Sequence, residues 1–265
     1  MSDLDKELER QRKLKSYNGP DRIVTSWELL DELHEQYKNH PLVELHSKIP
    51  TLDAHIHGFV PGEMTTISGE TGQGKTLFAQ SLTDAFVNQK AILLWFTFEV
   101  APYQFMQNFG DTVPLFMIPR EHRGYNIDWV MDKIEEAKIK TNVNAVFIDH
   151  LHFLIDMGRK HHNVSLEIGH VCRCLKRTAI DLEVSLFLLA HTQKADGSGN
   201  AEGNLTNNSI RDSSFVAQES DNVFFVRRNP VDPVQTAIKI TKNRRFGVMN
   251  AFVHLRKIGN FLREV

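Results

Sequence analysis

The stretch "GETGQGKT", residues 69–76, stands between a strand-like run, "MTTIS", and a helix-like run, "LFAQSLTDAF". It fits the pattern G-x-x-x-x-G-K-[S/T], whose glycines let the backbone N–H groups and the following helix point at a phosphate. The stretch predicts a nucleoside triphosphate site, and the complete pattern argues against an ordinary glycine-rich turn. The residues expected to bind the nucleotide are Gly69, Glu70, Thr71, Gly72, Gln73, Gly74, Lys75, Thr76 and Leu77.

Two side chains of this stretch and one later residue predict a magnesium site. Lys75 is expected to reach the β- and γ-phosphates, and the Thr76 hydroxyl to bind Mg²⁺. "VFID" ends in Asp149 after an apolar run, where a carboxylate can hold water bound to Mg²⁺. An aspartate after a strand is also common as a turn or cap residue, but a phosphate loop in the same chain favours the metal.

Two more polar residues follow strand-like runs. Ligands of open α/β sheets bind at the carboxyl ends of the strands, so these positions are candidates for chemistry. Glu99 follows "WFTF", where its carboxylate can orient and deprotonate an attacking water. His191 ends "FLLAH", where it can sense a γ-phosphate, although a lone histidine there is more often structural.

Composition narrows the class of protein. The chain has 265 residues, a formal net charge of −2 and 41% hydrophobic residues, which suits one large α/β domain with a small appendage. Any nucleic-acid contact must therefore use locally concentrated positive charge. Cys172 and Cys174 lie one residue apart in a helical pattern, so we expect buried, reduced thiols in a cytoplasmic protein. No apolar run is long enough to span a bilayer, and no signal peptide is recognisable.

The order of elements predicts a mostly parallel twisted sheet with helices on both faces, because apolar strands alternate with helices from residue 64 onward. The predicted strands are 64–68, 91–97, 144–149, 184–190, 221–227, 236–241 and 250–255, and the predicted helices are 75–88, 101–109, 126–139 and 164–182. Residues 191–213 form a polar stretch too long for a simple connection, which indicates a functional or disordered loop.

A short helical extension is expected before this domain. Residues 1–16 are highly charged and fit either a solvated helix or a disordered tail. The run from Ser26, a cap-like residue, places Trp27, Leu30 and Leu33 on one helical face. That face can pack on its own core or on a neighbouring subunit. We therefore divide the chain into an extension, 1–45, and a main domain, 46–265.

The stretch "ITKNRRFG", residues 240–247, carries four cations. A solvated hairpin is the simpler explanation. The alternative is charge delivered to an anion, either a phosphate at a neighbouring subunit's site or a nucleic-acid backbone.

The ordered motifs resemble the RecA-like motor domain of DnaB-type hexameric replicative helicases. The resemblance runs from about residue 47 to 265 through "TLDAHIHGFVPGEMTTISGETGQGKT", "FTFEV", "FIDHLHFL", "SIRDSSFVAQESDNVFFVRRN" and "ITKNRRFG". It implies that Glu99 is the water-activating base and that Lys242 and Arg244 act on the γ-phosphate held by the adjacent subunit. Arg228, or Arg227 in the other register, would pack against the base, and the loops 158–163 and 194–209 would face the central channel.

The resemblance also implies cofactors and partners. ATP or another nucleoside triphosphate with Mg²⁺ would drive a homo-hexamer along single-stranded DNA, with a primase or helicase loader as a further partner. DNA contacts would come from Arg159, Lys160, Lys194 and Arg211. Two alternatives stay open: a RecA-like recombinase or mediator that assembles on DNA without unwinding it, and a loading module that binds ATP but barely hydrolyses it.

Overall fold

The computed structural model describes residues 3–39, 41–121, 126–155, 164–191 and 214–264, and the chain divides into two compact units after Leu42. The first unit contains α1 (Asp3–Lys15) and α2 (Ser26–Asn39). Thr25 rather than Ser26 caps α2, because its hydroxyl accepts from the Glu28 N–H at 3.2 Å while the Glu28 carboxylate accepts from the Thr25 N–H at 2.8 Å. Trp27 is exposed, so its ring is not buried within this unit.

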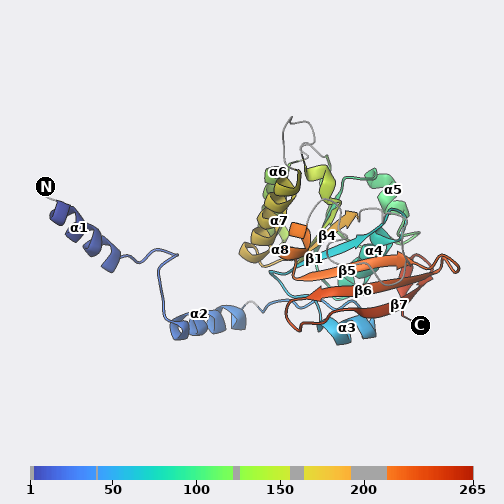
Figure 1. Ribbon diagram of the computed structural model, residues 1–265, viewed down its shortest axis with the longest axis horizontal. Coiled ribbons are helices and arrows are strands. Elements are labelled where there is room, and N and C mark those ends of the chain that lie inside the picture. Colours follow the sequence, from blue (N-terminus) through green and yellow to red (C-terminus); the bar gives the residue numbers. More distant parts are fainter. Residues whose placement is uncertain (1–2, 40, 122–125, 156–163, 192–213, 265) are drawn as a thin grey trace. The chain divides into compact units, whose positions relative to one another are not determined.

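The second unit is built on one eight-stranded sheet in the order β2-β3-β4-β1-β5-β6-β7-β8 (Figure 1). The pairs from β2 to β5 are parallel, and β5 to β8 form an antiparallel extension. The strands are β1 (Met64–Gly69), β2 (Leu93–Thr97), β3 (Ala145–Asp149), β4 (Ser185–His191), β5 (Asn222–Arg228), β6 (Gln235–Asn243), β7 (Ala251–Ile258) and β8 (Phe261–Arg263). The predicted α/β architecture with a mostly parallel sheet is confirmed.

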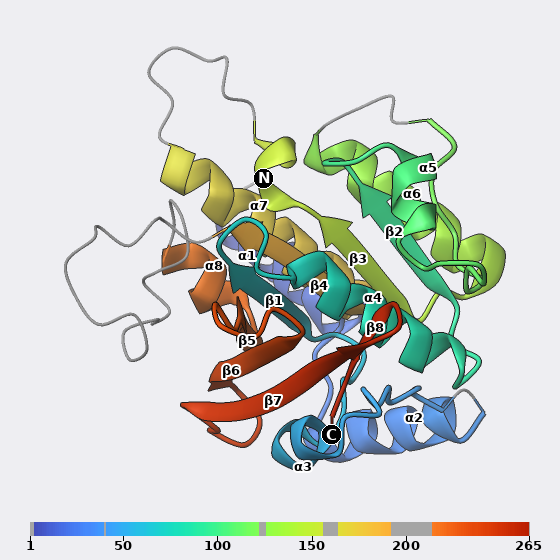
Figure 2. The same ribbon diagram turned by 90° about the vertical axis from the view of Figure 1, so that its right-hand side faces the viewer.

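Helices cover both faces of the sheet (Figure 2). The helices of this unit are α3 (Pro50–Ile56), α4 (Lys75–Val87), α5 (Pro102–Gln107), α6 (Ile127–Thr141), the 3-10 helix η1 (Leu151–Leu154), α7 (Val164–Asp181) and α8 (Ser214–Glu219). The hydrophobic core has two layers, one beneath α6, α7 and α8 and the other beneath α3, α4 and α5. Along the parallel strands β1 to β5 residues alternate between these layers, which is why these strands are mostly apolar.

β3 shows how the sequence dictates this packing. Val146 and Ile148 enter the first layer, and Ala145 and Phe147 enter the second. Phe147 stacks between Trp95 of β2 and Phe187 of β4, with ring centroids 4.6 Å and 4.5 Å apart. These three aromatic residues are register partners, so one stacked row ties three parallel strands together.

Several elements differ from the sequence prediction. α3, α8 and β8 were not predicted, because each is short and depends on burial rather than on a long periodic pattern. The helix expected over 101–109 is shorter and spans Pro102–Gln107. Cys172 is buried as expected, whereas Cys174 is only partly buried; both are free thiols.

Candidate functional site

The glycines of residues 69–76 are required by the backbone that surrounds them. Gly69 ends β1, and a Cβ there would lie 2.5 Å from the carbonyl oxygen of Val226. Gly74 has φ +98° immediately before α4, a conformation that favours glycine. The loop therefore leads from a buried strand into a helix whose free N–H groups are available to an anion.

Lys75 folds back over this loop. Its Nζ lies 2.9 Å from the Gly69 carbonyl oxygen, 3.0 Å from the Glu70 carbonyl oxygen and 3.0 Å from His191 Nδ1. Burial lowers the pKa of the Lys75 amine, and the charges of Asp149 and Glu99 oppose that shift. The ammonium is thus held beside the loop by hydrogen bonds to two carbonyl oxygens and a ring nitrogen, and a phosphate can replace these acceptors.

The oxygen ligands expected for magnesium are brought together by α4 and β3. The Thr76 hydroxyl donates to Asp149 Oδ2 at 3.0 Å. Asp149 Oδ1 is buried and has no hydrogen-bond partner among the described residues. Burial raises the pKa of the Asp149 carboxyl to about 6, partly offset by the Thr76 hydrogen bond. A hydroxyl and an under-satisfied carboxylate are the donor set that suits Mg²⁺ and its bound waters, so the residues fit the ion.

Two other strand ends join this cluster. Glu99, just after β2, is exposed, and His191 ends β4. Glu99, His150 and His191 each offer a ligand atom within 4.8 Å of the others, and the rings of His150 and His191 lie 4.2 Å apart. The predicted residues Lys75, Thr76, Glu99, Asp149 and His191 therefore meet at one edge of the sheet. His150 was missed, although its place directly after Asp149 was the signal.

Arg228 lies beside the loop. Its N–H donates to Gln73 Oε1 at 2.8 Å, and its guanidinium lies 3.9 Å from where a Cβ on Gly74 would stand. Side chains alternate along β5, which turns Arg227 toward the other face of the sheet. Of the two residues left open by the sequence, Arg228 is therefore the one that faces the phosphate loop.

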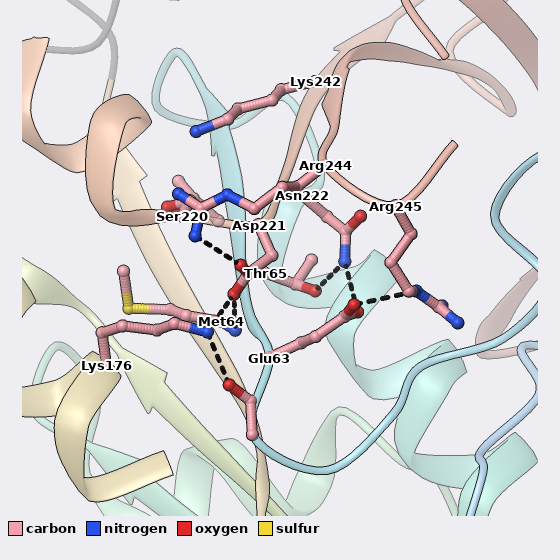
Figure 3. Close-up of polar contacts among 12 residues, drawn as sticks. Glu63, Met64, Thr65, Lys176, Ser220, Asp221, Asn222, Lys242, Arg244 and Arg245 are labelled. Carbon is pink, nitrogen blue, oxygen red and sulfur yellow. Dashed lines mark hydrogen bonds and ion pairs between the residues drawn. The ribbon is translucent and has the colours of Figure 1, made fainter. Parts of the chain in front are cut away.

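Lys242 and Arg244 lie near Asp221 and Met64, at the end of β1 opposite to the phosphate loop; Figure 3 shows them beside Ser220 and Asp221. Lys242 Nζ donates to the Ala217 carbonyl oxygen at 2.7 Å and to that of Gln218 at 3.1 Å. The Arg244 guanidinium contacts Asp221 Oδ1 and the Gln218 carbonyl oxygen, each at 3.0 Å. Asp221 in turn accepts from the N–H of Met64, the first residue of β1, at 2.8 Å. This cluster lies at the start of β1, roughly 16 Å of strand away from the phosphate loop at its end.

Asp221 is the centre of that cluster. Its carboxylate is buried and also binds Lys176 Nζ at 2.6 Å, while the same ammonium donates to the Gly62 carbonyl oxygen at 2.6 Å. Figure 3 shows Lys176 and Arg244 reaching the carboxylate of Asp221 from two directions. Sequence reasoning missed both Asp221 and Lys176, because their pairing joins positions 45 residues apart.

Replacing Asp221 by alanine is expected to lower the free energy of unfolding by about 3–5 kcal/mol, because the Lys176 ammonium loses its buried counter-ion. Urea denaturation followed by circular dichroism measures this. Arg244→Ala is the matched control: the Arg244 side chain is 52% exposed, so its loss should cost below about 1 kcal/mol. Equal losses for the two variants would contradict a stabilising role centred on the Asp221–Lys176 pair.

The residues expected to contact DNA lie outside the described residues. These are Arg159, Lys160, Lys194 and Arg211, together with the loops 158–163 and 194–209. Within the part of the chain that the structure describes, no helix is both long and apolar enough to cross a membrane.

Comparison with known families identifies the class. The family model of the DnaB-like helicase C terminal domain matches residues 110–261, more than half of the chain, so the chain belongs to this family. A "Probable plasmid replicative DNA helicase" of Chlamydia psittaci is 26% identical over 109 residues, 41% of this chain and 23% of the relative. "Replicative DNA helicase DnaB" of Haemophilus influenzae is 21% identical over 260 residues, 83% of this chain and 55% of the relative. The chain thus spans between about a quarter and about half of these relatives' lengths.

Solved structures share the fold. One ATPase domain of known structure superposes with a TM-score of 0.76 at 16% identity, covering 92% of this chain and 99% of that one. A DnaB-like replicative helicase, described with its interactions with primase, gives 0.73 at 15% identity, covering 99% and 72%. The RadB recombinase gives 0.61 at 14% identity, covering 83% and 99%. The predicted RecA-like ATPase fold and the resemblance to DnaB-type helicases are confirmed.

Proposed function

We propose that this chain is the motor domain of a magnesium-dependent nucleoside triphosphatase that assembles into a ring of six and moves along single-stranded DNA to unwind a duplex during replication. Its family supports this at the level of the class. The observation that carries the proposal is the convergence of Lys75, Thr76, Glu99, Asp149 and His191 at one edge of the sheet. Residues 46–265 would form the motor, and residues 1–45 its extension.

Each of these side chains has a role that its position allows. The loop N–H groups and Lys75 bind and orient the phosphates, and Thr76 and Asp149 hold Mg²⁺. When bound, the ion neutralises charge on the β- and γ-phosphates. The Glu99 side chain is exposed, so its carboxylate can position a water and accept its proton. His191 Nδ1 lies 3.0 Å from Lys75 Nζ. His191 would sense a γ-phosphate by losing this contact with Lys75 and contacting the phosphate instead.

Lys242 and Arg244, which we call the finger residues, complete the proposal. Both lie at the start of β1, so neither reaches the phosphate loop of its own chain. We assign them to the γ-phosphate of an adjacent copy, where a planar guanidinium stabilises developing negative charge. Single-stranded DNA, ATP or another triphosphate, and a primase or loader are the partners that this assignment implies. Arg159, Lys160, Lys194 and Arg211 remain the proposed DNA contacts.

A recombinase or mediator is the second candidate, because the RadB recombinase has the same fold. Strand displacement on a forked DNA substrate separates the two. ATP-dependent displacement supports the helicase, while DNA-stimulated hydrolysis without displacement supports the recombinase. A chain that binds nucleotide but barely hydrolyses it, with or without single-stranded DNA, would instead be a loading module.

Glu99→Gln keeps the shape of the side chain and removes its basicity. Nucleotide binding should be retained while hydrolysis falls by roughly a hundredfold or more, because general-base catalysis and water positioning are both impaired. Phosphate release and the affinity for a fluorescent nucleotide are measured on the same preparation. A parallel loss of binding and turnover would mean that Glu99 has a structural role.

A further inference from the structure

A groove lies on the antiparallel part of the sheet, on the face opposite to the one that α4 covers. Along β6 and β7, Ile238, Ile240, Val253 and Leu255 enter the core layer beneath α4. The intervening side chains face the other way and, with the end of β5, line a groove of about 840 Å³. That volume lies within the range of ligand-binding sites. β5, β6 and β7 lie side by side at the end of the sheet away from β2 (Figure 2).

The groove is strongly cationic. Arg227, Arg228, Lys239 and Arg256 line it together with His254, and none of the described lining residues is Asp or Glu. Asp232 is a nearby acid that lies 3.8 Å from Arg256 in an ion pair, and both of these side chains are well exposed. Among the described residues, the cations on this face are Arg227, Lys239 and Arg256, and they outnumber the rim carboxylate of Asp232 in a chain whose overall formal charge is −2. Such local charge favours an anionic ligand.

An aromatic ring lies among these charges. Phe252 is 45% exposed on β7, and Lys239 Nζ lies 5.6 Å from its ring centroid. An exposed ring beside cations is the arrangement with which proteins stack an unpaired base while neutralising the adjoining phosphates. A duplex would hide its base faces, and inorganic phosphate would leave the ring unused.

We propose that this groove binds a segment of single-stranded nucleic acid, with Arg227 and Arg256 on the phosphates and Phe252 beneath a base. The inference rests on the proposed function for its ligand class. Its location is new, because the groove includes none of the residues assigned to DNA above. It is also separate from the nucleotide site: Arg228 belongs to the rim of both, but its guanidinium faces Gly74 on the opposite face of the sheet.

Salt dependence tests the phosphate contacts. The affinity for fluorescein-labelled oligothymidylate is measured by anisotropy over a series of salt concentrations, without nucleotide. In Arg227→Gln and Arg256→Gln, the slope of log K against log [salt] should become shallower by about 0.7 for each phosphate that is no longer neutralised. Lys257→Gln is the matched control, because Lys257 follows Arg256 on β7, is exposed and does not line the groove. Its slope should equal that of the wild type.

Phe252→Ala tests the base contact. It should weaken binding about fivefold or more and leave the slope unchanged, since stacking carries no charge.

Unchanged slopes in both arginine variants would overturn the proposal. Unchanged slopes accompanied by weaker self-association in sedimentation would overturn it in favour of a contact between copies. If the arginine variants show the expected shallower slopes but the wild-type protein unwinds no forked DNA, the groove proposal stands and the helicase proposal fails. The two failures are therefore distinguishable.

Discussion

Lys75→Ala should abolish nucleotide hydrolysis and weaken nucleotide binding. The substitution removes the ammonium that the loop holds between the carbonyl oxygens of Gly69 and Glu70 and His191 Nδ1, and with it the charge aimed at the β- and γ-phosphates. Phosphate release and the affinity for a fluorescent nucleotide measure the two effects. Lys140→Ala, an exposed change on α6, is the control and should retain both activities. Wild-type turnover in Lys75→Ala would refute the nucleotide site.

Arg244→Ala should leave nucleotide binding nearly intact and reduce hydrolysis by about a thousandfold, the effect expected of an arginine that stabilises phosphoryl transfer. Arg244→Lys should recover little, because an ammonium lacks the planar fork of donors. Arg173→Ala is a matched control: this side chain is 53% exposed and ion-paired at 3.8 Å, but it lies on α7. A comparable loss in that variant would point to general surface charge instead.

Mixing two inactive variants tests action between subunits. In rings that contain both Lys75→Ala and Arg244→Ala chains, some interfaces pair an intact phosphate loop with an intact finger. Hydrolysis should therefore return in part when subunits exchange. No recovery in rings shown to be mixed would count against the finger, and the "TKNRR" cluster would then be a solvated hairpin or a DNA-backbone contact.

Local pattern predicted most of the fold. The apolar runs ending at Asp149 and His191 predicted strands within a few residues of their limits, because a strand buried on both faces has no polar positions to obscure it. The Thr25 cap and α8 were missed for different reasons. The capping residue of α2 is Thr25, one position before the predicted Ser26. The helix α8 has only six residues and is stabilised by packing against α7 and by the Lys242 ammonium of β6.

The candidate site was predictable where a motif spaces its residues along the chain. Lys75 and Thr76 follow from the loop, and Asp149 and His191 from the rule that ligands meet at strand ends. The choice between Arg227 and Arg228 required the register of β5 against the loop. The Asp221 cluster and the groove around Phe252 could not be predicted, because only the folded sheet brings their elements together: β1, α7 and the start of β5 for the first, and β5, β6 and β7 for the second.

The separation of the phosphate loop and Arg244 by the length of β1 has a consequence for assembly. If Arg244 acts on the γ-phosphate of a neighbour, as we propose, each copy carries one half of a catalytic centre at either end of β1. A dimer with two-fold symmetry uses the same surface patch on both copies, so it would need both halves within one patch. Because the halves lie at opposite ends of β1, the proposal requires copies that join head to tail. Such an interface repeats until the rotation closes a circle, or continues as an open helical filament if it does not. The angle between adjacent copies, rather than any residue of the centre, therefore decides which assembly forms.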